Sequence, residues 1–136
     1  MFQDTKAFSS FSVNDLDVAR KFYHEVLGLK IQAIITDQGA KLLELHISGG
    51  SKILVYSKPD HEPASFTILY FPVENVEKAV KEMMLLGIKF EHYHNKEVQT
   101  DESGIFRGGG PAKAWFKDPA GNVFSVTETD KTRPLD

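Results

Sequence analysis

The chain has 136 residues, which is long enough to bury one hydrophobic core in a single domain. Its hydrophobic content of 41% and charged content of 26% are typical of globular proteins and argue against disorder. The net charge is −3 and no block of Lys or Arg stands out, so the electrostatic signature of a nucleic-acid-binding protein is missing. The sequence has no cysteine, which excludes disulfides, thiol catalysis and thiolate-bound zinc.

The first ten residues, MFQDTKAFSS, lack the basic and then apolar pattern of a signal peptide. No apolar run approaches the length that spans a membrane. We therefore expect a cytoplasmic protein that contacts neither a membrane nor nucleic acid.

Two segments are predicted to form helices, and both begin and end with the same kinds of residue. In residues 14–28, Asn14 or Asp15 can cap the first turn, and Gly28 can end the helix in the left-handed conformation. In residues 74–87, Asn75 and Gly87 take these places. Apolar residues recur at helical spacing in both segments. They are Leu16, Ala19, Tyr23, Val26 and Leu27 in the first, and Val76, Ala79, Val80, Met83 and Leu86 in the second.

The two helical segments belong to a longer repeated pattern. Val13 superimposes on Val73 at an offset of 60 residues, whereas Gly28 superimposes on Gly87 at an offset of 59. One residue is therefore lost inside the second helix. The shared order of strand, cap, helix, glycine and strand indicates an internal duplication.

Strand-like stretches surround each helix, and the turn residues between them favour short connections. Ser48-Gly49-Gly50-Ser51 predicts a hairpin, and residues 118–122 predict another turn. Each half is therefore predicted to be a β-α-β-β-β module in a single α+β domain over residues 1–136. Module one covers residues 6–57, a polar linker covers 58–65, and module two covers 66–128. The predicted strands are residues 8–13, 30–36, 41–48 and 52–57, then 66–73, 89–96, 112–117 and 123–127.

Two motifs, in this order, resemble those of the vicinal-oxygen-chelate superfamily, which includes glyoxalase I, extradiol dioxygenases, fosfomycin-resistance proteins and bleomycin-binding proteins. One is Val-Asn-Asp-Leu at 13–16, followed by Phe22-Tyr23 and by Val-Leu-Gly-Leu at 26–29. The other is Phe-Lys-Asp-Pro-Ala-Gly-Asn at 116–122. The resemblance implies that the two modules form a cup-shaped, mostly antiparallel sheet, with helices on its convex side and the ligand on its concave side.

In metal-dependent members of that superfamily, one metal ligand comes from each of four strands. The resemblance places these ligands at Phe8, Leu54, Ile68 and Ser125. Three of these side chains are apolar, and a serine hydroxyl is a weak ligand for a divalent ion. We therefore expect no metal and no cofactor.

Strand alternation predicts which side chains face the cup. The expected wall is apolar and aromatic, which suits a flat or cationic group, although the same rings could simply fill the cup or form a dimer contact. Glu44 and His46 share one strand face, so they could act as a general acid and base or could be a solvated pair. Arg107 lies in a glycine-rich stretch that could be a mobile lid, where it could meet an anionic group, or an ordinary connection. The candidate ligand-binding residues are Phe8, Glu44, His46, Tyr56, Tyr70, Arg107, Trp115 and Ser125.

The leading hypothesis is a glyoxalase/bleomycin-resistance-like protein that binds a small aromatic or cationic molecule in its cup without a metal. The resemblance also implies a homodimer, and the cup could be built within one chain or across two. The alternative is a glyoxalase-like lyase, isomerase or dioxygenase that uses Glu44, His46 or Tyr56 in an unconventional site. A third hypothesis is a regulatory module with a vestigial cup.

Overall fold

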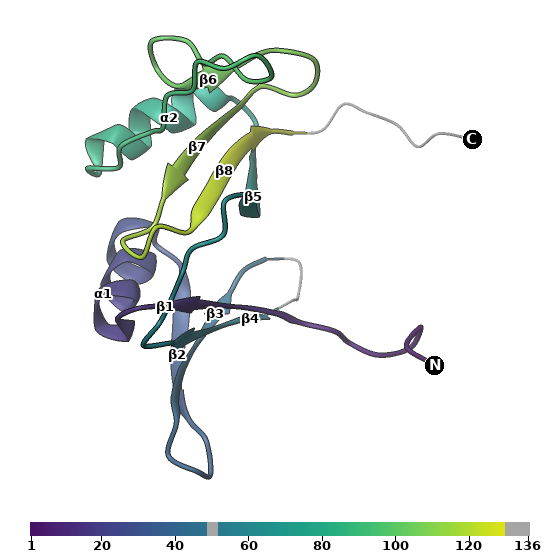
Figure 1. The fold of residues 1–136 in the computed structure, drawn as a ribbon, viewed down its shortest axis with the longest axis vertical. Helices are drawn as coiled ribbons and strands as arrows, with labels where there is room; N and C mark the ends of the chain where they lie inside the picture. The colour runs from purple at the N-terminus through teal and green to yellow at the C-terminus, as the bar shows by residue number, and fades with distance from the viewer. Residues whose placement is uncertain (49–51, 130–136) are drawn as a thin grey trace. The chain divides into compact units, whose positions relative to one another are not determined.

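The chain divides into two compact units, Met1–Pro63 and Ala64–Asp136, and the division falls inside the predicted linker. The structure, a computed structural model, describes residues 1–48 and 52–129 (Figure 1). Residues 49–51 of the predicted hairpin turn lie outside the described residues. Each unit combines a helical segment with a four-stranded mixed sheet, so the α+β prediction of paired β-α-β-β-β modules is confirmed. No helix in the described ranges is long and apolar enough to cross a membrane.

In the first unit the strands are arranged in the order β1-β4-β3-β2. β1 runs parallel to β4, and the other two pairings are antiparallel. The helical segment lies between β1 and β2 in the chain and packs against β3 and β4. The elements are β1 (Ser9–Val13), α1 (Leu16–Lys21), η1 (Phe22–Val26), β2 (Lys30–Ile35), β3 (Lys41–His46) and β4 (Lys52–Ser57).

The core of this unit lies between the helical segment and one face of the sheet. Leu43 and Leu45 of β3 are buried there together with Val55 of β4. The fully buried ring of Tyr23 contacts Phe11 edge-on, with ring centroids 6.0 Å apart. Because successive strand residues point to opposite faces, the residues between these core positions lie on the open face of the sheet.

The first helix contains a wide turn that the second helix lacks. Its last segment, η1, is a π-helix, in which the Leu27 amide donates to the Phe22 carbonyl at 3.0 Å. Leu29 N–H donates to Tyr23 O at 2.9 Å, and the equivalent bond in the second unit joins Ile88 N–H to Met83 O at 3.2 Å. The first of these two bonds spans one residue more than the second. A π-turn accommodates one extra residue, so it accounts for the change of offset from 60 to 59 in the repeat.

The second unit repeats the arrangement, with strand order β5-β8-β7-β6 and a parallel pairing of β5 with β8. The rings of Phe71, Phe116 and Phe124 pack together beneath α2, whose Val76 and Val80 are buried. The elements are β5 (Thr67–Val73), α2 (Val76–Leu85), β6 (Ile105–Phe106), β7 (Lys113–Lys117) and β8 (Val123–Glu128).

The predicted strand at residues 89–96 is wrong. This segment makes only isolated bridges, from Phe90 to Phe116 and from His94 to Gln99. Glu91 N–H donates to Trp115 O of β7 at 2.7 Å, but the residues after it bond locally. Tyr93 N–H donates to Thr100 Oγ1 and Tyr93 O accepts from Thr100 N–H, both at 2.9 Å, and Asn95 N–H donates to Val98 O at 3.0 Å. Such local bonds compete with strand pairing. The fourth strand of the sheet is β6, which lies in the glycine-rich stretch that was expected to be a lid or a connection.

Gly28 and Gly87 follow the helices with φ angles of 70° and 90°. A Cβ atom added at either position would meet nothing within 4 Å, so only the backbone conformation opposes a side chain there. Gly87→Ala is expected to lower the free energy of unfolding by about 1–2 kcal/mol, and Gly87→Asn by less, because asparagine tolerates this conformation better. Denaturant titration measures both values. The control Leu85→Ala changes a side chain that is 88% exposed and is expected to have little effect. Equal losses for the Ala and Asn variants would contradict the explanation.

Candidate functional site

Three of the predicted site residues form a row across the open face of the second sheet. Ser125 on β8 is paired with Tyr70 on β5 and with Trp115 on β7. Ser125 is fully buried between them, and its hydroxyl donates to Val126 O at 3.2 Å and lies 2.9 Å from Thr127 Oγ1. Tyr70 is 54% exposed. The row therefore presents two aromatic side chains with a buried hydroxyl between them.

Trp115 also forms the wall of a pocket of about 210 Å³. Its indole N–H donates to Thr67 Oγ1 at 3.0 Å, which fixes the plane of the ring. Tyr93 meets the indole edge-on at 5.5 Å between ring centroids, and Phe106 lies at 6.0 Å. Phe66 lines the pocket and is 68% exposed. The lining residues are Ser65, Phe66, Thr67, Tyr93, Asn95, Val98, Trp115 and Val123.

Three aromatic residues of this site were not predicted from the sequence: Tyr93 and Phe66, which line the pocket, and Phe106, which contacts Trp115. Tyr93 lies in the predicted strand 89–96, which does not form, and Phe106 lies in the glycine-rich stretch, whose sequence gives no strand signal. Burial raises the pKa of the Tyr93 phenol, and the Glu91 carboxylate raises it further, while the Lys117 ammonium opposes the shift. The phenol is therefore neutral at physiological pH and can donate a hydrogen bond.

The open face of the first sheet carries a charged cluster. His46 Nε2 lies 3.0 Å from Glu44 Oε1, and Lys52 Nζ lies 3.7 Å from Glu44 Oε2. The Lys52 ammonium also lies 5.8 Å from the centre of the Phe8 ring. The Glu44 side chain is only 13% exposed, so this cluster is more than a solvated pair. Tyr56 lies on the same face, opposite Leu42 and Ser12 on the neighbouring strands.

His61, which lies in the predicted linker, adds to this face. Its Nδ1 lies 2.6 Å from the Ser12 hydroxyl. This contact joins residues that are far apart in the chain, so nothing in the spacing of the sequence pointed to it. It ties the linker to β1 beside Tyr56.

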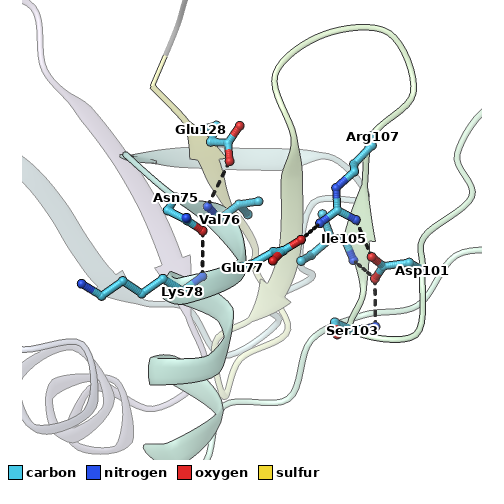
Figure 2. Close-up of polar contacts among 9 residues, drawn as sticks. All are labelled: Asn75, Val76, Glu77, Lys78, Asp101, Ser103, Ile105, Arg107 and Glu128. Atoms are coloured by element: carbon cyan, nitrogen blue, oxygen red, sulfur yellow. Dashed lines mark hydrogen bonds and ion pairs between the residues drawn. The ribbon is translucent and has the colours of Figure 1, made fainter.

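Arg107 is not brought together with the aromatic row. Its guanidinium pairs with Glu77 of α2 and, at 2.6 Å, with Asp101 Oδ2 (Figure 2). The buried Ile105 packs on the helix side of the sheet, whereas Phe106 reaches Trp115 on the open side. Arg107 therefore lies on the helix side, where it lines a cleft of about 650 Å³ with Asn75, Glu77, Gly110, Pro111, Ala112, Glu128 and Thr129.

This cleft is larger than the aromatic pocket, but its polar side chains already have partners in the protein. Asn75 Oδ1 accepts from Lys78 N–H at 3.0 Å, and Glu128 Oε1 accepts from Val76 N–H at 3.3 Å (Figure 2). Glu77 is paired with Arg107. The bonds from Val76 N–H and Lys78 N–H cap the first turn of α2. The cleft is therefore a weaker candidate for ligand binding than the aromatic pocket.

The residues at the four positions implied for a metal do not fit one. Phe8, Leu54 and Ile68 offer no donor atom, and the buried Ser125 hydroxyl is engaged with Val126 and Thr127. Among the residues that the structure describes, no three or more His, Asp or Glu side chains gather in a group that could hold a metal ion.

Asp101 holds the segment between α2 and β6 through several bonds. Its Oδ1 accepts from Ser103 N–H at 2.8 Å and from Ile105 N–H at 2.9 Å. Burial alone would raise the pKa of this carboxyl, but the hydrogen bonds from Ile105, Arg107 and Ser103 and the charge of Arg107 together lower it.

A carboxyl whose pKa is lower in the folded protein than in the unfolded chain stabilises the fold when the pH is above its pKa in the unfolded chain. This stabilisation is lost as the pH falls through its pKa in the folded protein. Asp101 is therefore expected to stabilise the protein at neutral pH and to lose this effect progressively below about pH 4. Melting temperatures of the wild type and of Asp101→Asn, measured from pH 7 to pH 3, show how this stabilisation depends on pH. The two melting temperatures are expected to converge as the pH falls, and a constant difference would contradict the assignment.

The sequence and the fold are both similar to those of known proteins. A family model for the Glyoxalase/Bleomycin resistance protein/Dioxygenase superfamily matches residues 8–126. No curated protein matches the sequence significantly. Among solved structures, a glyoxalase family protein from Enterococcus faecalis is similar with a TM-score of 0.66 at 19% identity, over 94% of this chain and 100% of that one.

Two further structures carry names that refer to antibiotics. TnmS3, an antibiotic binding protein from Streptomyces sp. CB03234, has a TM-score of 0.65 at 20% identity, over 94% of this chain and 99% of that one. The fosfomycin resistance protein FosX from Listeria monocytogenes has a TM-score of 0.66 at 12% identity, over 94% and 95%. At these identities the likeness shows the fold alone. Because the family model spans most of the sequence and the two modules have the expected topology, the chain belongs to the Glyoxalase/Bleomycin resistance protein/Dioxygenase superfamily.

Proposed function

We propose that the chain is a metal-independent binding protein that holds a small aromatic or cationic molecule against Trp115. The observation that carries this proposal is the pocket walled by Trp115, Tyr93 and Phe66 on the open face of the second sheet. The bond from the indole N–H to Thr67 holds the ring, so a flat ligand meets a preorganised surface. The faces of such rings attract both aromatic groups and cations.

The size of the pocket limits what it can enclose. Drug-sized ligands occupy sites of roughly 300–1,000 Å³. The pocket of about 210 Å³ is smaller, so it accommodates one flat group of a ligand rather than a whole large molecule. The exposed Tyr70, next to Ser125 in the row, offers further surface for the rest of such a ligand.

The relatives support this class of function. One similar structure is described as an antibiotic binding protein, and another as a fosfomycin resistance protein. Both descriptions concern small organic molecules. The apolar residues at the metal positions support binding without a metal in this chain.

A second candidate function is supported by the charged cluster on the first sheet. A largely buried carboxylate 3.0 Å from an imidazole can set the tautomer and orientation of that imidazole for proton transfer. This arrangement would suit a lyase or isomerase that uses Glu44 and His46 as a proton-transfer pair. Substrate turnover that His46→Ala abolishes while the fold is kept would favour this candidate over simple binding.

The binding proposal is tested by calorimetric titration with two probes, bleomycin and the planar cation 9-aminoacridine. Saturable binding to at least one probe is expected, and prior dialysis against EDTA is expected to leave the Kd unchanged. Trp115→Leu is expected to weaken binding by about tenfold or more, because a stacked cation gains up to about 2 kcal/mol on such a ring.

Leu85→Ala serves as the control, since it removes an exposed side chain on α2 and leaves the aromatic pocket unchanged. Circular dichroism establishes that both variants fold. Absence of saturable binding to both probes would contradict the proposal, as would equal affinities of the wild type and Trp115→Leu.

A further inference from the structure

The ring of Trp115, which lines the aromatic pocket, is contacted by a residue of a very short strand. β6 contains only Ile105 and Phe106, which pair with Ala114 and Lys113 of β7. Phe106 reaches the Trp115 ring at 6.0 Å with an interplanar angle of 39°. Two paired residues at the edge of a sheet give little stability by themselves. The position of Phe106 therefore depends on what holds the residues on either side of it.

On one side of Phe106, Arg107 anchors the chain. Its guanidinium bridges Glu77, in the first turn of α2, and Asp101, in the turn before β6 (Figure 2). Asp101 in turn accepts from the Ile105 amide at 2.9 Å, and its own amide donates to Ile105 O at 2.9 Å. One arginine thus joins the helix, the turn and the edge strand. Charge-assisted contacts of one guanidinium with two carboxylates restrict its geometry, but these side chains are 40–60% exposed, so solvent screening keeps their contribution modest.

Beyond Arg107, the backbone packs directly on the Phe106 ring. A Cβ atom added at Gly108 would lie 2.7 Å from an atom of that ring. Such an approach requires glycine, because any side chain would displace the ring or the loop. Phe106 is therefore confined between Trp115 and the loop that begins at Arg107, so a shift of this loop moves the ring.

We infer that Arg107 is a positioning residue for the aromatic pocket: through Glu77 and Asp101 it holds Phe106 against Trp115 and so controls the fit of a flat ligand. The contact is indirect, because Arg107 lies on the helix side of the sheet and the pocket lies on the other. This inference rests on the proposed function for its consequence in binding. The position of Phe106 against Trp115, by contrast, can be tested in the protein without ligand.

The test uses Trp115, the only tryptophan in the chain, as a reporter. Arg107→Gln is expected to shift the Trp115 emission to longer wavelength and to raise its acrylamide quenching constant. The reason is that Phe106 moves away from Trp115, so water and acrylamide reach the indole more easily. Glu77→Gln, which keeps the pair of Arg107 with Asp101, and Arg107→Lys, which keeps the charge, are expected to give intermediate shifts. Affinity for 9-aminoacridine is expected to fall by about two- to fivefold in Arg107→Gln, because the effect passed to the pocket is bounded by the modest stability of exposed ion pairs.

The matched control for Glu77→Gln is Glu82→Gln, which makes the same chemical change at an exposed glutamate further along α2. It is expected to leave emission, quenching and affinity unchanged. The variant Phe106→Leu is expected to reproduce the quenching change of Arg107→Gln, and the double variant is expected to add no further change.

A purely structural role would give a different result. If Arg107→Gln and Glu77→Gln lower the melting temperature but leave emission and quenching as in the wild type, the inference is overturned. Additive quenching changes in the double variant would also overturn it. If the quenching changes occur as expected while the wild type binds neither bleomycin nor 9-aminoacridine, the positioning role stands and the proposed function fails.

Discussion

In the described part of the chain each module has one helical segment, and this segment covers one face of its four-stranded sheet. The aromatic and aliphatic side chains beneath the helix, such as Phe116 and Phe124 in the second unit, determine which face that is. Side chains alternate along a strand, so each core residue fixes the outward direction of its neighbours. Trp115 lies on the open face because Phe116 is in the core. The candidate site is thus a consequence of how the core is packed.

The open faces of the two sheets carry chemically different side chains. The open face of the first sheet carries a carboxylate, an imidazole and an ammonium in contact, centred on Glu44. The open face of the second carries aromatic rings around a buried hydroxyl. The helix side is similar in both units, with apolar strand residues under a capped helix that ends at a glycine. The duplicated scaffold has kept its core pattern, while its two open faces have diverged.

The faces of the strands could be predicted from the sequence, because alternation needs only the local pattern. Glu44 and His46 share one face of β3 as expected, and Leu43 and Leu45, which alternate with them, are buried on the other. The repeat also predicted both helices and their terminal glycines. The parts that could not be predicted depend on contacts between residues distant in the chain or on competing local bonds. Residues 93–100 form local hydrogen bonds through Thr100 and Asn95, and a two-residue strand between turns has no recognisable period. The partners of Arg107 and His61 depend on tertiary packing, so their roles appear only in the structure.

The parallel pairing of the first and last strands in each module has a consequence for the order of folding. β1 lies beside β4, and β5 lies beside β8, with the rest of the module between them in the chain. The antiparallel pairs of β2 with β3 and of β3 with β4 join neighbouring segments and need only short loops to close. Closing a long loop costs more chain entropy, and non-local pairing slows folding. The parallel strands are therefore expected to join each sheet late, and until then the edges of β4 and β8 are open to other chains during synthesis.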